Sequence, residues 1–265
     1  MGAQCGCGNV MNRLFCALFM IAIPDTAALQ SLDIPIPPRN LRYRIVTSHI
    51  EESQFIESGR QCVGDIMRAL NEAGVDAGGF SEVLDFGCGC ARVLRFFVPF
   101  LPHVKFSGCD IDKLAITWDR EHLPGVDFEL VPHLPPTPFA REKFDFIYGL
   151  SVFSHLDLPR QILWLDELRG ILKPGGVLLL TVHGAAGFER AREKKEITPK
   201  QQADFETVGF VFVENIPDKV LPEWYQTAIF KERFARLVFG SGFSVLRYDE
   251  RGMTGWQDVI LMRKQ

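Results

Sequence analysis

Short apolar runs alternate with amphipathic stretches through the middle of the chain. The runs that predict strands are residues 83–86, 105–109, 126–131, 144–148 and 177–182. The patterns that predict helices are residues 51–73, 91–100, 114–122 and 159–172. Strands that are apolar on both faces and separated by helices are typical of a parallel sheet covered by helices. We therefore expect an α/β fold with a doubly wound, mostly parallel sheet.

This alternation breaks after Gly184. Residues 188–204 are highly charged, with opposite charges at helical spacing, and predict one solvated helix. A helical pattern at 230–239 and two strand patterns at 243–248 and 258–262 close the chain. The order indicates an insertion after the fifth strand, at residues 184–230.

The N-terminal region stands apart from the pattern. Residues 14–23 form an apolar run that Pro24 stops, and ten residues are too few to cross a bilayer. We favour a loosely attached tail. The alternatives are the core of a signal peptide, a helix packed on the domain, an interfacial anchor and an upstream extension that the mature protein does not keep. The prolines of residues 35–38 indicate a stiff linker. We expect a tail and linker over residues 1–41, a main domain over 42–265, a cytoplasmic location and no stable membrane span.

The amino-acid composition limits the kinds of binding partner that we expect. The net charge of −4 gives no broad attraction to nucleic acid or to an anionic membrane. The seven cysteines lack the two-residue spacing of zinc or thioredoxin motifs, so we expect reduced thiols and no metal. The 22 phenylalanines have no polar group, which favours places in a core or along an apolar pocket.

The sharpest local feature is the glycine-rich turn after the first strand. Gly87 and Gly89 let the backbone turn tightly and approach a ligand. A dinucleotide-binding turn would carry a third glycine where Arg92 stands, so the pattern disfavours a nicotinamide cofactor. Asp110 ends the second strand, where a carboxylate can accept hydrogen bonds from both ribose hydroxyls. The alternative for such a residue is a helix N-cap, which Asp112 could also provide.

These segments together resemble the class I S-adenosylmethionine-dependent methyltransferases. The segments that match the family's motifs are residues 83–89, 106–112, 144–148 followed by 151–156, and 168–177. Ala91 departs from the family, which often has a glycine there. The resemblance implies a seven-stranded sheet of order 3-2-1-4-5-7-6 with the last strand antiparallel.

The resemblance also implies a cofactor, S-adenosyl-L-methionine, and the residues that hold it. The cofactor-binding candidates are Asp85, Gly87, Cys88, Gly89, Cys90, Asp110, Ile111, Leu134, Leu150 and Ser151. His155 is the candidate catalytic base or substrate contact, with a hydrogen-bonded structural histidine as the alternative. The candidate substrate contacts are Arg60, His183, Trp224 and Tyr225, from the first helix, the fifth strand and a lid formed by the insertion. Simple packing of the insertion on the sheet is the alternative for the aromatic pair.

The absence of several known motifs limits the kinds of methyl acceptor that we expect. Residues 149–152 read Gly-Leu-Ser-Val, which lacks the Asn/Asp-Pro-Pro-Tyr/Phe motif of amino-methyltransferases that act on nucleic acids. No Pro-Cys pair provides a nucleophile, and no carboxylate between residues 148 and 155 provides a magnesium ligand. We expect methyl transfer to a small molecule or glycan at oxygen, with no nucleic-acid partner and the oligomeric state open. The alternatives are an inactive S-adenosylmethionine-binding module and an NAD-dependent oxidoreductase.

Overall fold

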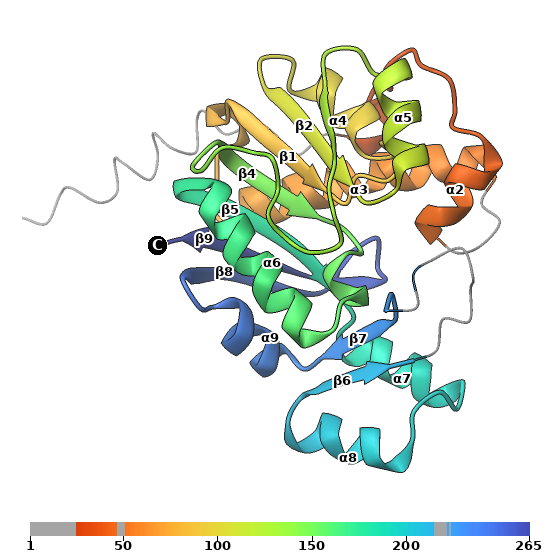
Figure 1. Ribbon diagram of the computed structural model, residues 1–265, viewed down its shortest axis with the longest axis vertical. Helices are drawn as coiled ribbons and strands as arrows, with labels where there is room; N and C mark the ends of the chain where they lie inside the picture. The colour runs from red at the N-terminus through yellow and green to blue at the C-terminus, as the bar shows by residue number, and fades with distance from the viewer. Residues whose placement is uncertain (1–24, 47–50, 215–221, 223) are drawn as a thin grey trace, which may run out of the picture.

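Seven strands form one sheet at the centre of the computed structural model, which describes residues 25–46, 51–214, 222 and 224–265 (Figure 1). The strands are β1 (Glu82–Phe86), β2 (Lys105–Asp110), β3 (Asp127–Leu130), β4 (Phe144–Gly149), β5 (Leu172–Val182), β8 (Phe243–Met253) and β9 (Gln257–Lys264). Their order is β3-β2-β1-β4-β5-β9-β8, and β9 runs antiparallel to both of its neighbours. β6 and β7 lie in a separate sheet, so β8 and β9 are the sixth and seventh strands of this sheet. The observed order therefore confirms the predicted order 3-2-1-4-5-7-6.

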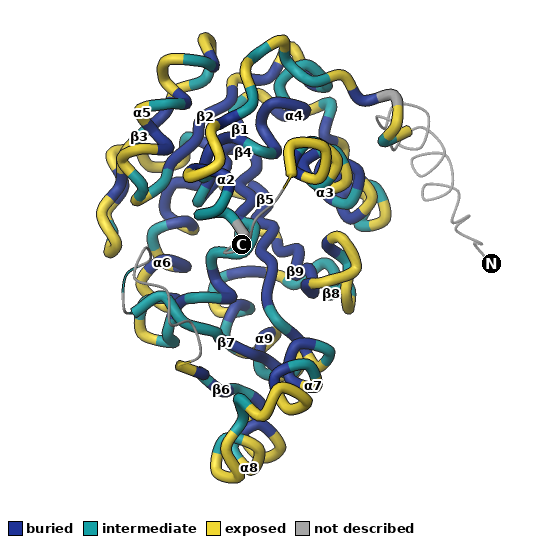
Figure 2. The backbone as a smooth tube through the Cα atoms, turned by 90° about the vertical axis from the view of Figure 1, so that its right-hand side faces the viewer, coloured by how far each residue is buried: buried dark blue, intermediate teal, exposed yellow. Residues whose placement is uncertain are grey.

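Helices cover both faces of this sheet. The helices of one face are α3 (Glu52–Glu72), α4 (Leu94–Phe100) and α5 (Lys113–His122), and those of the other are α6 (Leu158–Ile171) and α9 (Glu232–Phe239). Successive side chains of β5 pack into the hydrophobic cores on opposite faces of the sheet. Leu179 packs with α3 and α4, while Leu178 packs with α6. Figure 2 shows α3 and α6 on opposite sides of a buried sheet. The doubly wound architecture predicted from the apolar runs is confirmed.

A short helix, α2 (Arg39–Val46), begins inside the region predicted as linker. Pro38 stands just before it, and the Pro38 carbonyl accepts the first hydrogen bonds, from the backbone of Leu41 and Arg42. Leu41 is buried in a small cluster with Phe55 of α3 and Cys90 of the glycine-rich turn. The helix therefore packs on the domain. The apolar run at residues 14–23 lies outside the described residues, and none of the described helices is long and apolar enough to cross a membrane.

The insertion after β5 is a small subdomain that extends from one end of the sheet (Figure 1). Its elements are α7 (Ala185–Glu193), α8 (Pro199–Thr207), β6 (Phe210–Val213) and β7 (Thr227–Phe230). The single helix predicted over 188–204 is wrong, because Lys195 takes a left-handed φ of 61° and Thr198 caps a new helix. β6 and β7 pair antiparallel. Phe188 stacks on Phe205 at 3.9 Å between ring centroids and gives the insertion its own core.

The insertion is joined to the end of β5 by backbone pairing. Ile229 of β7 forms a parallel bridge with His183, and the Phe230 amide donates a 2.8 Å hydrogen bond to the His183 carbonyl. This attachment places the insertion beside the carboxyl ends of the parallel strands, where ligands bind in such sheets.

Candidate active site

The glycine-rich turn connects β1 to α4 at the carboxyl end of the sheet. Gly87 has a φ of +78°, and its amide donates a 2.8 Å hydrogen bond to the Cys109 carbonyl at the end of β2. A Cβ on Gly87 would lie 2.3 Å from Cγ2 of Val152, so both conformation and space require glycine there. The turn is therefore held against the loop that follows β4.

Ala91 also takes a left-handed conformation, with a φ of 54°. An L-residue in this region costs roughly 1–2 kcal/mol relative to a right-handed conformation. A glycine adopts this left-handed conformation without that cost, which explains why the family often has glycine at the position of Ala91. The turn runs on past Ala91, and α4 begins only at Leu94 rather than at residue 91.

Asp110 is positioned by the backbone of the turn. Its Oδ2 accepts a 2.8 Å hydrogen bond from the Gly89 amide, and its Oδ1 accepts one of 2.8 Å from the Asp112 amide. Asp112 itself caps α5, accepting a 2.9 Å hydrogen bond from the Leu114 amide, so Asp110 is not the cap. A carboxylate has about four acceptor positions, which leaves Asp110 with two for a ligand. Burial raises the pKa of Asp110.

Asp85 and Asp119 add two more buried carboxyl groups to this region. Asp85 accepts a 2.9 Å hydrogen bond from the Tyr148 hydroxyl, and burial raises its pKa to about 7. Burial, together with the charges of Asp110 and Asp85, raises the pKa of Asp119 to about 9. Arg92 provides an opposing positive charge near Asp85. A cluster of buried carboxyl groups with so little compensation favours a ligand that carries positive charge.

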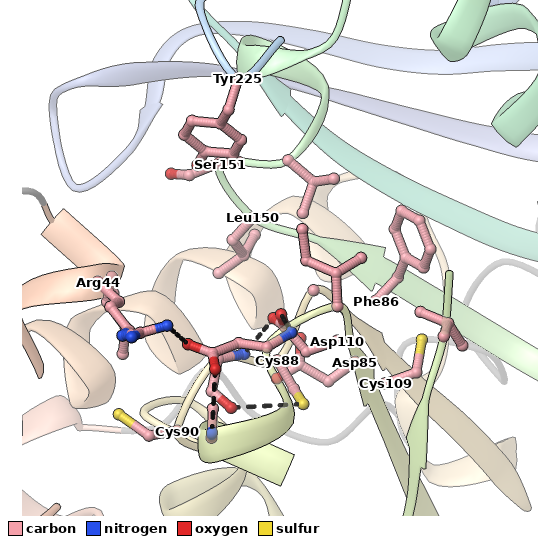
Figure 3. Close-up of a pocket in the computed structure, with 18 of the residues that line it drawn as sticks. Arg44, Asp85, Phe86, Cys88, Cys90, Cys109, Asp110, Leu150, Ser151 and Tyr225 are labelled. Carbon is pink, nitrogen blue, oxygen red and sulfur yellow. Dashed lines mark hydrogen bonds and ion pairs between the residues drawn. The ribbon is translucent and has the colours of Figure 1, made fainter. Parts of the chain in front are cut away.

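A first cavity of about 480 Å³ opens over this turn. Figure 3 shows Asp85, Cys88 and Asp110 gathered on one side, with Leu150, Ser151 and Tyr225 on the other. The predicted cofactor-binding residues that line it are Asp85, Gly87, Cys88, Gly89, Cys90, Asp110, Ile111, Leu150 and Ser151. Leu134 does not line it, and its neighbour His133 does. The volume is within the usual range for a small-ligand or cofactor site.

Helix α2 contributes residues to the first cavity that sequence reasoning missed. Leu41, Arg44 and Ile45 line it, and Arg44 forms a 2.8 Å ion pair with Asp112 (Figure 3 shows Arg44). Nothing in the eight-residue sequence of α2 distinguishes it from a linker. The contact with Asp112 arises only when the N-terminal segment folds back over the sheet.

A second cavity of about 590 Å³ adjoins the first. The residues that line both are Ile45, Arg92, Leu150, Ser151 and Tyr225. His155 and His183 line only the second cavity, while Trp224 lines only the first. Arg60 lines neither, because it pairs with Glu57 at 3.3 Å and lies over the Phe96 ring.

The two histidines are held as neutral rings. The Gln226 carbonyl lies 2.9 Å from Nδ1 of His155, and since a carbonyl only accepts, Nδ1 carries the proton and Nε2 is the acceptor. Burial lowers the pKa of His155 to about 4 and that of His183 to about 3. Nδ1 of His183 is buried without a hydrogen-bond partner among the described residues. The His155 ring stacks on Tyr225 at 4.3 Å between centroids.

Hydrogen bonds fix Ser151, one of the residues that line both cavities. Ser151 has a φ of 58°, and its amide donates a 2.7 Å hydrogen bond to Oγ1 of Thr181. Its hydroxyl donates a 2.9 Å hydrogen bond to Oε1 of Gln257, whose Nε2 donates one of 3.1 Å to Ser154. Thr181 near the end of β5 and Gln257 at the start of β9 thus hold the loop that follows β4. Gln257 is a residue of the candidate site to which the sequence assigns no role, because it lies far from the recognised motifs.

Comparison with known proteins agrees with this geometry. Residues 84–178 match a family model described as a methyltransferase domain. The chain is 25% identical over 168 residues to a malonyl-[acyl-carrier protein] O-methyltransferase of Halalkalibacterium halodurans. That match covers 59% of this chain and 61% of the relative, so the chain aligns with less than two thirds of the relative's length.

Two solved structures have a similar fold. The PH0226 protein from Pyrococcus horikoshii superposes with a TM-score of 0.57 at 17% identity, covering 84% of this chain and 98% of that one. A 1,6-didemethyltoxoflavin-N1-methyltransferase from Burkholderia thailandensis, bound to its substrate and S-adenosylhomocysteine, gives 0.55 at 15%, covering 89% and 94%. At such identities the similarity concerns the fold.

Three observations agree with one another: the strand order, the glycine-rich turn with Asp110 beside it, and the matched domain model. Together they indicate a fold that binds a nucleoside. Residues 84–178 thus match a methyltransferase domain, and the strand order is the one implied by the resemblance to the class I S-adenosylmethionine-dependent methyltransferases. The domain match agrees with the predicted resemblance.

Proposed function

We propose that this protein transfers a methyl group from S-adenosylmethionine to an oxygen atom of a small-molecule acceptor. The observation that carries this proposal is the pair of adjoining cavities, which share a wall of Leu150, Ser151 and Tyr225. One cavity has the acidic, glycine-rich lining that suits the cofactor. The other adjoins it at these shared residues and provides a separate place for an acceptor next to the cofactor.

The first cavity fits the cofactor in charge and shape. Asp85 and the backbone of residues 87–89 would receive the ammonium-bearing amino-acid tail, because buried carboxylates stabilise a cation. Asp110 would hold the ribose hydroxyls with its two remaining acceptor positions. Ile111 would pack against the adenine. When bound, S-adenosylmethionine supplies a methyl group on a positively charged sulfur.

The second cavity would orient the acceptor and exclude water. His155 and Tyr225 form its stacked inner wall, and the insertion provides the outer wall through residues of α7 and Thr227. Methyl transfer depends mainly on alignment, because the methyl carbon is already activated. The volume suits a small molecule or a short glycan. The name of the bacterial relative, an O-methyltransferase, supports oxygen as the acceptor atom.

A thermal-shift experiment tests the cofactor, and a transfer experiment tests the activity. We expect S-adenosylhomocysteine to raise the melting temperature and NAD to leave it unchanged, because only a ligand of the native state stabilises it. Label from methyl-labelled S-adenosylmethionine should then appear in an acceptor from a panel of alcohols, phenols, carboxylic acids and sugars. Stabilisation by NAD alone would contradict the proposal. Binding of S-adenosylhomocysteine without transfer to any acceptor would support the inactive binding module instead.

A further inference from the structure

Positive charge gathers on one side of the second cavity. Arg190 and Lys194 lie one helical turn apart at the end of α7, and both line the cavity together with Arg92. Glu196 is the one acidic residue among the described residues that line it. Burial and the Arg251 charge lower the pKa of Arg190, and among the described residues Asp258 is the carboxylate whose charge acts on Arg190 to raise that pKa against them. The described lining of the cavity therefore carries more positive than negative side chains.

Arg190 is held in a fixed orientation. Its guanidinium carbon lies 3.8 Å from the centroid of the Trp256 ring, and Nη2 donates a 3.1 Å hydrogen bond to the Trp256 carbonyl. A guanidinium has five N–H donors in a planar fork, so donors remain for a ligand. The nearby Asp258 carboxylate is hydrogen-bonded to the Tyr248 hydroxyl at 2.7 Å and to the Arg251 amide at 2.8 Å. A stacked, oriented guanidinium of this kind suits two-point binding of a carboxylate.

The histidines of the second cavity are poorly suited to removing a proton. Burial holds the pKa of His155 near 4, so its Nε2 is a weak base toward a hydroxyl. His183 is a weaker base still, with a pKa near 3. An acceptor oxygen that is already negative at neutral pH needs no base at all. The side chains of this cavity therefore match an ionised acceptor better than an alcohol.

We propose that the acceptor is a carboxylic acid, held in the second cavity by Arg190 and Lys194 and methylated on a carboxylate oxygen. This inference rests on the proposed function and specifies its substrate class. The carboxylate oxygen forms a bond to the methyl carbon as the carbon–sulfur bond breaks, and the electron pair of that bond stays on sulfur. The positive charge of the sulfonium and the negative charge of the carboxylate cancel. The products are a methyl ester and a thioether, and no proton is released.

Matched variants of α7 test the binding role of Arg190. We expect Arg190→Gln to raise the KM for a carboxylic acid by roughly 10- to 100-fold, from the loss of a charge-assisted hydrogen bond, with a smaller change in kcat. Arg190→Lys should restore part of the affinity. The control is Arg192→Gln on the same helix, because Arg192 pairs with Glu189 and does not line the cavity. Calorimetry should give the same affinity for S-adenosylhomocysteine in all four proteins. Equal KM values for Arg190→Gln and Arg192→Gln would overturn the assignment.

The acceptor class is tested with paired probes. Octanoate and phenylacetate are compared with 1-octanol and 2-phenylethanol, and a pH indicator measures proton release per turnover. We expect methyl esters of the two acids and no net proton release. Transfer to the alcohols alone, with one proton released per methyl group, would overturn the carboxylate while leaving the proposed function standing. Failure to bind S-adenosylhomocysteine would instead contradict the proposed function. Binding without transfer to either acid, together with transfer to another acceptor of the panel, would overturn the carboxylate alone.

Discussion

The Tyr148 hydroxyl donates a 2.9 Å hydrogen bond to Oδ2 of Asp85, and the two residues are direct register partners in the neighbouring strands β4 and β1. Both side chains are buried. The fourth strand thus positions the acidic residue that ends the first strand. We propose that Asp85 receives the cofactor's ammonium group, and Tyr148 positions Asp85 without itself lining the first cavity.

Replacing Tyr148 with phenylalanine should therefore destabilise the protein in a pH-dependent way. The hydroxyl lowers the pKa of Asp85 against the effect of burial, so its loss raises that pKa above about 7. We expect Tyr148→Phe to cost roughly 1–3 kcal/mol at pH 8.5, where Asp85 would otherwise ionise, and less at pH 5. Urea unfolding at the two pH values measures the difference. An equal loss at both would show that packing, not the hydrogen bond, is responsible.

Asp119 should make the protein less stable as the pH rises. Its folded pKa of about 9 lies above the ordinary value of 3.8, so its contribution to stability is complete below pH 4 and is lost as the pH rises toward 9. Oδ1 of Asp119 has no partner among the described residues. We expect Asp119→Asn to flatten this decline and to raise stability at pH 8 by a few kcal/mol. Unfolding curves at pH 5 and pH 8 provide the measurement, and an unchanged slope would contradict the prediction.

Gly87 offers a test of the turn with a built-in control. Gly74 has a similar φ of +69°, but nothing lies within 4 Å of a Cβ there, whereas a Cβ on Gly87 meets Val152. We expect Gly74→Ala to cost about 1 kcal/mol from backbone strain alone. Gly87→Ala should cost more and should weaken S-adenosylhomocysteine binding at least tenfold. Calorimetry and chemical denaturation measure the two effects, and equal behaviour of the variants would remove the steric argument.

Asp110 should be essential for cofactor affinity and less so for the fold. Asp110→Ala removes the acceptor of the Gly89 and Asp112 amides and the proposed ribose contact. We expect a loss of roughly 10- to 100-fold in S-adenosylhomocysteine affinity. Asp110→Asn keeps one acceptor oxygen and should lie between the wild type and the alanine variant. Circular dichroism checks the fold, and an unchanged affinity in calorimetry would refute the ribose assignment.

The sheet could be predicted from the sequence because its information is local. Apolar runs give the strands, and the segments that match known motifs give their order. Side-chain placement outside these motifs depends on tertiary contacts. The proline-rich loop decides whether His133 or Leu134 faces the first cavity. Arg60 lines neither cavity, because it pairs with Glu57, and helix periodicity alone does not show which neighbours a helix face contacts. The sequence shows Arg190 only as part of a charged segment, since its cavity forms when the insertion docks on β5.

The attachment of the insertion through Ile229 and His183 has an evolutionary consequence. The first cavity is lined mainly by residues before position 165, while much of the second is lined by a subdomain with its own core around Phe188 and Phe205. With the proposed assignment of the two cavities, mutations in that subdomain alter which acceptor is chosen while the cavity proposed for the methyl donor stays the same. Acceptor preference can thus diverge between descendants of one ancestral gene without a new donor site having to arise.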